Sequence, residues 1–319
     1  MLLSPRWRKV FRDLWSNKSR TILVVLSITI GVSAFGGLFT ARSLILTSLD
    51  REFQATNPSD INMTIPNIDD LLVQYMARQP YVTGVQTYTS HRAEILINGE
   101  VTNAELIAFE DMNDIRLNIV NHEAGVYPPN HNEVVLERSF LDDLDIQIGD
   151  ILTIRTSDNK LHEFRLVGTV HSLAIQPGAL LTPVWITPRA LFNMGLSTEE
   201  NQMELTVMRQ GDPDTFNIPP IQEIATQIRE DLRDHSINVL SLQVKEDTTF
   251  WATDILAAVI AVLVIIGMSS LFLSAFLVIN TISGIMAAQK KQIGIMKIIG
   301  ADRMQIIIIY LVMVTILGL

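Results

Sequence analysis

One segment of the sequence runs for 32 residues without a charged side chain: Ile255–Met286, ILAAVIAVLVIIGMSSLFLSAFLVINTISGIM. About 20 apolar residues are enough for a helix to cross the hydrocarbon core of a bilayer. The sequence therefore predicts a transmembrane helix over 251–286. This helix is longer than one crossing needs, so we expect it to tilt or to continue beyond the bilayer as a stalk.

Two further apolar segments lie near the ends of the sequence. Ile22–Ala41 is almost free of charge and predicts a first transmembrane helix over 21–42. It is longer than a usual signal-peptide core and lacks a small-x-small cleavage site, which favours an uncleaved anchor over a cleaved signal peptide. Ile306–Leu319 is too short to span. We expect it to be the truncated start of a third transmembrane helix, with a buried helix of a soluble core as the alternative.

The charged residues are sorted along the chain, whose net charge is −10. Residues 1–20 hold six basic residues and one acidic residue, and residues 287–305 hold four basic residues and one acidic residue. Residues 43–250 hold 13 basic and 31 acidic residues. Short basic flanks stay in the cytoplasm. The pattern predicts a multi-pass protein of the cell (plasma) membrane with a cytoplasmic N-terminus and an extracytoplasmic domain over 43–250.

Aromatic residues mark the expected membrane surfaces. Trp7, Phe11 and Trp15 fall on one face of a helix within residues 1–20, and basic residues lie mostly on the other face. This amphipathic pattern suits the inner membrane surface, although a plain juxtamembrane helix remains the alternative. Trp251 is expected at the outer edge of the second span. Small residues one turn apart, Ser27 with Gly31 and Ser270 with Ser274, permit close helix contact.

The sequence of the acidic domain predicts an α+β fold. We expect this fold to form without disulfides, because the sequence has no cysteine. Strand and helix patterns over 60–101 and again over 203–244 suggest two β-α-β halves packed together. The first helix, about Ile68–Arg78, places Leu71, Leu72, Tyr75 and Met76 on one face, and a hairpin turns at Asn98-Gly99. Between the halves, residues 125–188 predict a β-rich lobe that ends in loops around Gln176–Pro188. In that lobe we expect Ile151–Arg155 to pair with Glu163–His171, and we expect Ser139 to cap a short helix.

The motifs that would carry chemistry are missing from the sequence. There is no P-loop, no H-E-x-x-H spacing among the six histidines and no G-x-S-x-G elbow. The acidic run Asp142–Asp145 lacks the ligand order of a calcium loop and suits a solvated helix end. We therefore predict no catalytic, cofactor-binding or metal-binding residue in this chain, and a membrane enzyme is the weakest hypothesis.

The segment 287–305 follows the long apolar run and reads AAQKKQIGIMKIIGADRMQ. The pattern over Lys290–Ile299 predicts a short helix that ends where Gly300 adopts a left-handed backbone conformation, a left-handed stop. We expect Asp302 to cap the N-terminus of the next helix. This helix carries a small apolar surface flanked by lysines, called here the apolar knuckle, which consists of Ile295, Met296, Ile298 and Ile299. Periodicity alone leaves two interpretations open, a knuckle that docks in a partner's groove and a turn that lies on lipid headgroups.

This segment is similar to the cytoplasmic loop of the FtsX-like permease family, whose pattern is roughly R-x-x-E-I-G-x-x-x-A-x-G-A. The sequence QIGIMKIIGA over 292–301 fits that pattern, except that Gln292 replaces a glutamate and lysine or glutamine stands where an arginine is usual. The acidic domain resembles the MacB-like periplasmic core domain in the order of three motifs. These are NEVVL at 132–136, IGDILTI at 148–154 and FRLVGTV at 164–170.

The resemblance implies the permease subunit of a type VII ABC transporter. ATP with Mg²⁺ would then bind a separate ATPase subunit, and motion of the cytoplasmic loop would be transmitted to the extracytoplasmic domain (mechanotransmission) during export or extraction of a lipoprotein, peptide or drug. The expected partners are the ATPase, a second permease unit, membrane lipid and an extracytoplasmic protein, with no nucleic acid. The implied ATPase-coupling residues are Lys290, Lys291, Gln292, Ile293, Gly294, Ile295, Met296, Lys297, Ile298, Ile299 and Gly300. The alternative is a membrane-anchored binding or signalling module without an ATPase.

Overall fold

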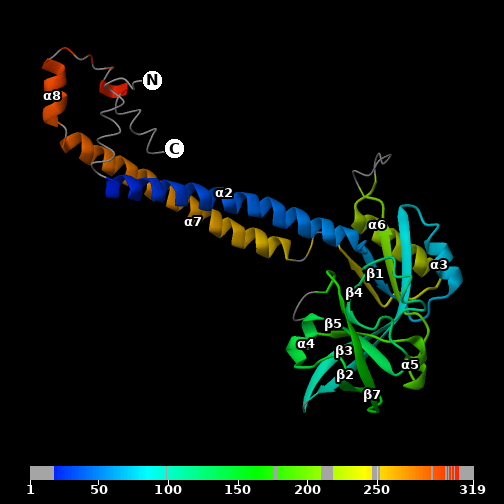
Figure 1. Ribbon diagram of the computed structural model, residues 1–319. Coiled ribbons are helices and arrows are strands. Elements are labelled where there is room, and N and C mark those ends of the chain that lie inside the picture. The colour runs from blue at the N-terminus through cyan, green and yellow to red at the C-terminus, as the bar shows by residue number, and fades with distance from the viewer. Residues whose placement is uncertain are drawn as a thin grey trace. The chain divides into compact units, whose positions relative to one another are not determined.

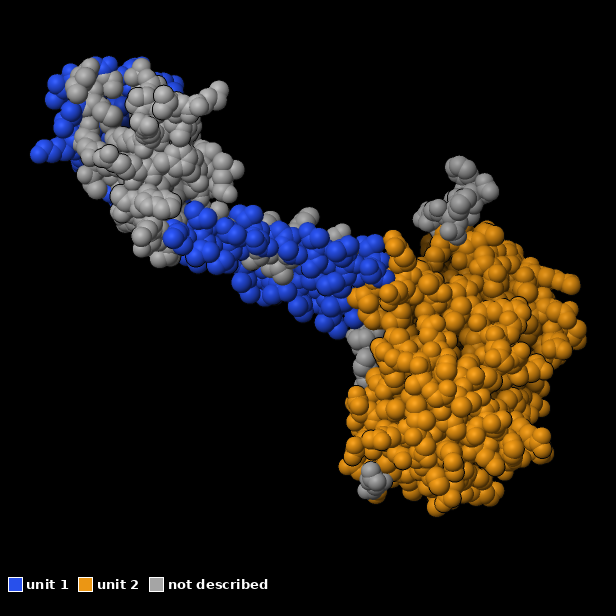
Figure 2. All heavy atoms as spheres, viewed as in Figure 1, with its two compact units in different colours: residues 1–48, 252–319 blue, residues 49–251 orange. Residues whose placement is uncertain are grey.

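The computed structural model describes residues 18–97, 99–175, 179–209, 218–245, 250, 252–288, 290–298, 300, 302, 304 and 306–308. The element order is shown in Figure 1. The chain divides into two compact units, coloured separately in Figure 2. Unit 1 comprises Met1–Ser48 with Ala252–Leu319, and unit 2 comprises Leu49–Trp251.

Unit 1 contains two long helices, α2 (Lys18–Ala55, whose last turns belong to unit 2) and α7 (Thr253–Ala288). Within α7, Thr253–Asn280 is long and apolar enough to cross a membrane, and it is the one such segment among the described residues. Only 11% of its most apolar window is buried within the chain. Large apolar side chains such as Ile265 and Phe272 are exposed along it. An apolar, largely uncovered helix suits a lipid environment. The bracketing of the domain by several spans stays a prediction.

Helices α2 and α7 approach each other closely at Gly31 and Ser274. Gly31 is buried, and Ser274 is 9% exposed. A Cβ atom added at Gly31 would lie 3.0 Å from the Ser274 hydroxyl oxygen and 3.7 Å from the Ser274 Cβ. The expected use of small residues in this helix contact is confirmed for Gly31 and Ser274. The side chain of Ser27 lies outside the described residues.

A cysteine pair at this contact is expected to form a disulfide between α2 and α7. The separation of 3.7 Å between the two Cβ positions is close to the mean Cβ separation of natural disulfides, about 3.8 Å. We expect Gly31→Cys with Ser274→Cys to cross-link under mild oxidation, as seen by non-reducing electrophoresis after protease cleavage between the helices. Because the native chain has no cysteine, no other intramolecular bridge can form.

The matched control pairs Gly36→Cys with Ser274→Cys. A Cβ atom at Gly36 meets nothing within 4 Å, so this pair should stay reduced. Equal cross-linking of the two pairs would contradict the observed register of α2 on α7.

The first layer of unit 2 is a four-stranded antiparallel arrangement in the order β10-β1-β9-β2. Its strands are β1 (Ile61–Thr64), β2 (Val82–Ile97), β9 (Gln202–Val207) and β10 (Ser241–Val244). Helix α3 (Asp70–Met76) connects β1 to β2, and α6 (Ile221–Asp234) connects β9 to β10. The two predicted β-α-β halves are therefore confirmed. They interleave, because β9 lies between β1 and β2, which is the split β-α-β arrangement of ferredoxin-like folds.

One face of this layer is apolar and packs against α3 and α6. Ile61 and Met63 on β1 and Met203 and Leu205 on β9 are buried together with side chains of both helices. The helix side chains are Leu72, Met76, Ile224, Ala225, Ile228 and Leu232. The period-two pattern of the strands therefore points every second side chain at the helices. Leu71 is 74% exposed, so its predicted place on the buried face of α3 is wrong.

The long strand β2 belongs to two parts of the sheet. Its first half pairs with β9, and from Thr89 onward it pairs with β3 (Glu100–Ala108) through the predicted hairpin, where Gly99 has φ +87°. The sequence suggested two separate strands over 84–101, whereas β2 is continuous for 16 residues. The sheet then continues in the order β3-β8-β5-β7-β4, and β6 pairs with β2 and β7.

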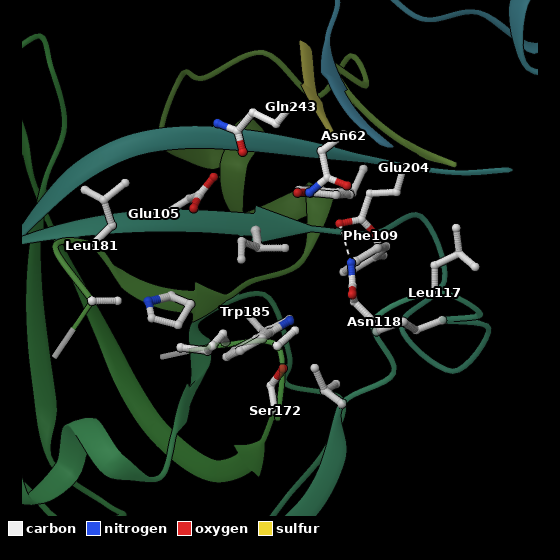
Figure 3. Close-up of a pocket in the computed structure, with 18 of the residues that line it drawn as sticks. Asn62, Glu105, Phe109, Leu117, Asn118, Ser172, Leu181, Trp185, Glu204 and Gln243 are labelled. Atoms are coloured by element: carbon white, nitrogen blue, oxygen red, sulfur yellow. Dashed lines mark hydrogen bonds between the residues drawn. The ribbon is translucent and has the colours of Figure 1, made fainter. Parts of the chain in front are cut away.

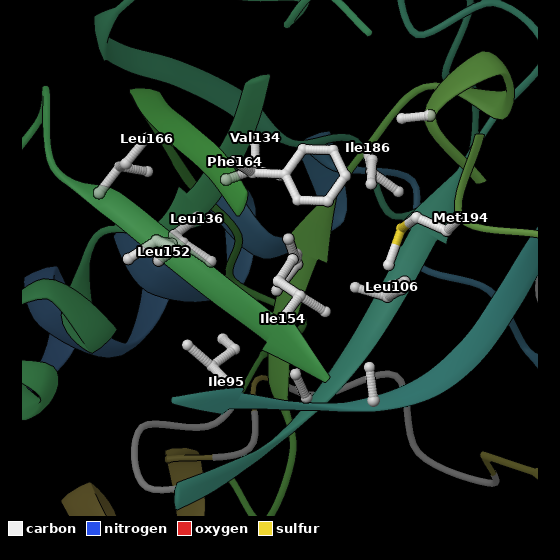
Figure 4. Packing of buried hydrophobic residues seen from close by; sticks show 14 of the residues in the cluster. Ile95, Leu106, Val134, Leu136, Leu152, Ile154, Phe164, Leu166, Ile186 and Met194 are labelled. Carbon is white, nitrogen blue, oxygen red and sulfur yellow. The ribbon is translucent and has the colours of Figure 1, made fainter. Parts of the chain in front are cut away.

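The remaining elements form a β-rich lobe around a second core, shown in Figure 4. They are β4 (Asn121–Gly125), β5 (Glu133–Glu137), α4 (Ser139–Leu144), β6 (Ile151–Arg155), β7 (Leu161–His171), β8 (Thr182–Trp185) and α5 (Pro188–Asn193). The expected pairing of β6 with β7 is confirmed. The core includes Ile95, Leu106 and Met194, so the lobe takes in more of the chain than the predicted 125–188.

Two local predictions in this lobe are wrong. The segment predicted as loops contains β8, whose four residues are all buried because β8 lies between β3 and β5. Ser139 is not the N-cap of α4. Arg138 occupies that position without a side-chain cap, and the Ser139 hydroxyl donates instead to the buried carboxylate of Glu137.

Candidate functional site

The sheet face turned away from α3 and α6 carries a row of polar side chains. Gln243 on β10 lies opposite Asn62 on β1, Asn62 lies opposite Glu204 on β9, and Glu204 lies opposite Gln86 on β2. Directly paired residues of antiparallel strands project to the same face. Four neighbouring strands therefore each place an amide or a carboxyl group in one line across the sheet.

The segment 109–120, which follows β3, is fixed to this polar row by hydrogen bonds. The Gln86 side-chain oxygen accepts from the backbone N–H groups of Arg116, at 2.6 Å, and Leu117, at 3.0 Å. Its amide nitrogen donates to the Leu117 carbonyl at 3.1 Å. Asn118, with φ +48°, donates from Nδ2 to Glu204 Oε1 and to the Ser59 hydroxyl, both at 2.8 Å. The segment is thereby held against the sheet by side chains of β2 and β9.

Beside this segment lies a cavity of about 740 Å³, shown in Figure 3. Six strands that are neighbours in the sheet, from β10 to β8, contribute lining residues. Three aromatic side chains, Tyr88, Phe109 and Trp185, line it together with several aliphatic ones. Its polar lining consists of Asn62, Glu105, Asn118, Ser172, Glu204, Gln243 and Lys245. A cavity of this size that combines aromatic and aliphatic side chains with several polar groups is typical of small-molecule sites.

The electrostatics of the cavity are dominated by Glu204, which is 5% exposed. Burial raises the pKa of Glu204 to about 7, against the hydrogen bond from Asn118 and the charge of Lys245, which both lower it. The charge of Glu105 raises it further. Burial and the same two carboxylates hold the pKa of Tyr88 well above its usual value. The cavity thus contains a carboxyl group that changes its charge near neutral pH.

None of the cavity residues was singled out by the sequence motifs. The available signal was the polar residue in the middle of each apolar strand, Asn62 in INMT and Glu204 in QMELTV. Such a residue fits the solvent face of a half-buried strand equally well. The cavity appears only when β3, β8 and the segment 109–120 lie over that face.

The predicted cytoplasmic helix is present as α8 (Lys290–Ile298). Gly300 has φ +99°, and its N–H donates to the Lys297 carbonyl at 3.2 Å, so the expected left-handed stop is confirmed. Ile295 is 50% exposed and Ile298 is 86% exposed. Lys290, Lys291 and Lys297 are exposed as well. The helix therefore presents two isoleucines outward among three cations.

The other predicted site residues are placed only in part. Ile293 is half-buried and Gly294 is exposed. The side chains of Gln292 and Met296 are outside the described residues, as is all of Ile299. The predicted membrane-interface residues also lie outside the described part of the chain. They are Trp7, Phe11, Trp15 and Trp251.

Comparisons with known proteins give structural likenesses only. No family model matches the sequence, and the comparison with curated proteins finds no match. The periplasmic region of MacB from Actinobacillus actinomycetemcomitans is 12% identical, with a TM-score of 0.34, over 65% of this chain and 95% of that one.

Two further solved structures give similar values. The extracellular domain of the noncanonic ABC-type transporter YknZ from Gram-positive bacteria is 10% identical, with a TM-score of 0.36, over 59% of this chain and 99% of that one. A domain of a permease protein from Porphyromonas gingivalis is 10% identical, with a TM-score of 0.35, over 60% of this chain and 91% of that one.

Proposed function

We propose that this chain is the permease subunit of an ABC transporter and that α8 is the element that contacts a separate ATPase subunit. The observation that carries the proposal is the exposure of Ile295 and Ile298 on a short lysine-flanked helix. Exposed apolar side chains on a stiff helix favour a partner groove. The sequence QIGIMKIIGA over 292–301, which is similar to the cytoplasmic loop of the FtsX-like permeases, overlaps this helix.

The connectivity of the chain suits transmission of movement. Helix α8 begins two residues after α7 ends, and α7 begins two residues after unit 2 ends. A displacement of α8 by a nucleotide-driven partner would pass into α7, and α7 follows unit 2 directly in the sequence. This is coupling through a rigid element, and it requires that the ATPase bind ATP with Mg²⁺ on its own subunit.

The proposal includes a location and partners. The charge pattern supports a multi-pass protein of the plasma membrane with unit 2 outside and α8 inside the cell. A second permease unit would supply the symmetry of a transporter, and an extracytoplasmic protein would receive the movement. The class of transported molecule, whether lipoprotein, peptide or drug, would be identified from the extracytoplasmic partner that unit 2 contacts.

The substitution Ile295→Asp tests the proposed contact. A charge buried in an apolar groove without a partner is strongly unfavourable. We therefore expect the amount of ATPase that co-purifies with the variant to fall at least about tenfold. The measurement is the recovery of a P-loop ATPase, identified by mass spectrometry, together with Mg-ATP hydrolysis by the purified complex. Membrane insertion should be normal.

The matched control is Ile148→Asp, because Ile148 is 42% exposed in unit 2, away from α8 in the sequence. It should retain the ATPase. Equal recovery with Ile295→Asp and the native chain would exclude α8 as the contact.

The cavity of unit 2 favours a second candidate, a membrane-anchored binding or signalling module that works without an ATPase. A site of about 740 Å³ with a buried carboxyl group is what such a module would need. A single preparation distinguishes the two candidate functions. A module without an ATPase would purify from native membranes free of any nucleotide hydrolase, with or without Ile295→Asp.

A further inference from the structure

The cavity wall holds a carboxyl group with spare hydrogen-bonding capacity. Within the described residues, Asn118 is the one hydrogen-bond donor to Glu204, and it contacts only Oε1. An ionised carboxylate can accept about four hydrogen bonds. A buried carboxylate that receives only one hydrogen bond therefore favours the binding of a ligand that brings N–H groups or a positive charge.

The charges around the cavity favour a cation over an anion. Glu204 and Glu105 both line it, whereas Lys245 is the one basic residue among the lining residues that the structure describes. In that part of the chain Lys245 forms no ion pair with either carboxylate, and the salt bridges that exist lie elsewhere. The Ser90 hydroxyl donates to Glu105 Oε1 at 2.6 Å, so Glu105 is held in place without being neutralised.

The apolar part of the wall is suited to a cation with an apolar body. The rings of Tyr88 and Phe109 lie 5.0 Å apart, between centroids, and Trp185 is 3% exposed on the neighbouring strand β8. Aromatic faces attract ammonium groups and also contact aromatic or aliphatic carbon. Figure 3 shows Phe109, Glu204 and Trp185 around one hollow.

We propose that this cavity binds a small organic cation, an amine with an aromatic or aliphatic body, whose charged nitrogen lies beside Glu204 and whose body contacts Tyr88, Phe109 and Trp185. The proposal does not depend on an ATPase. It gives unit 2 a ligand site of its own, separate in the sequence from the contact proposed for α8.

The charge state of Glu204 gives the site a pH dependence. The ligand favours the ionised carboxylate, so binding should strengthen as the pH rises from about 6 to about 8, through the pKa of about 7. The other titratable groups at the cavity are Glu105, Lys245 and Tyr88. Glu105 opposes the ionisation of Glu204, and Lys245 assists it.

The test uses the full chain in phosphatidylcholine nanodiscs and three indoles that differ in charge. Tryptamine is the cation, 3-ethylindole the neutral analogue and indole-3-acetate the anion. Calorimetric titration at pH 8, corrected with empty nanodiscs, should show tryptamine binding at least about tenfold more tightly than 3-ethylindole. Indole-3-acetate should bind more weakly than either. Glu204→Gln should remove the preference for tryptamine and leave 3-ethylindole unchanged.

The matched control is Glu163→Gln, because Glu163 is exposed on β7 and does not line the cavity. It should bind all three compounds as the native chain does. Tighter binding of indole-3-acetate would assign the site to an anion held by Lys245 and overturn the proposal. Equal binding of tryptamine by the native chain and Glu204→Gln would overturn it as well. Neither result would bear on the ATPase contact, which is read out by co-purification.

Discussion

Replacing Glu204 by glutamine is expected to stabilise unit 2 by about 3 kcal/mol at pH 8 and to have little effect near pH 4. The pKa of Glu204 is raised by burial from its ordinary value of 4.5 to about 7 in the folded chain. The folded state therefore holds this proton more tightly than the unfolded state. Stability is lost as the pH rises from about 4.5 through 7, and glutamine, which stays neutral, avoids that loss.

The measurement is chemical denaturation of the full chain between pH 4 and pH 9, followed by tryptophan fluorescence, to which the buried Trp185 contributes. Glutamine keeps an oxygen that can accept the hydrogen bond from Asn118, so the variant changes the charge and little else. Glu163→Gln, at an exposed position, should show the pH profile of the native chain. Parallel profiles for Glu204→Gln and the native chain would show that Glu204 is ionised in the folded state without cost.

Local patterns in the sequence predicted the elements whose structure is set by their own residues. The isoleucine stripe of α6 gives a buried face at Ile224 and Ile228, and Asn98-Gly99 predicts a hairpin that the pairing of β2 with β3 confirms. Gly300 ends α8 because a residue without a side chain tolerates a positive φ. In each case neighbouring residues determine the conformation, so a single sequence is enough.

Contacts between distant segments account for the features that the sequence left out. β8 reads as a loop because Pro183 and the nearby Pro177, Gly178 and Pro188 suggest turns, yet pairing with β3 and β5 on either side makes it a central strand. The candidate cavity depends in the same way on register. Asn62, Glu204 and Gln86 come from positions up to 142 residues apart, and only the pairing of β1, β9 and β2 aligns them. No local pattern records that alignment.

Replacing Gln86 by leucine is expected to destabilise unit 2 by about 2–4 kcal/mol and to release the segment 109–120 from the sheet. Gln86 is 9% exposed, and its side chain makes three hydrogen bonds to the backbone of Arg116 and Leu117. Leucine has a similar volume and no polar atom, so two backbone N–H groups and one carbonyl lose their partners. Each such loss in a buried place costs about 1–3 kcal/mol, part of which the segment recovers by moving toward water.

Hydrogen–deuterium exchange distinguishes this local release from general unfolding. In Gln86→Leu the amides of Arg116 and Leu117 should exchange at least about tenfold faster, while those of the β-rich core, such as Leu106 and Leu136, change no more than the loss of global stability requires. Gln74→Leu, at an exposed position on α3, should leave both sets unchanged. Because Phe109, Leu117 and Asn118 all line the cavity, the released segment should also weaken tryptamine binding. Normal exchange at Arg116 and Leu117 would show that Asn118 and the backbone bonds from Asn118 and Ile119 to Asn57 and Thr56 hold the segment without Gln86.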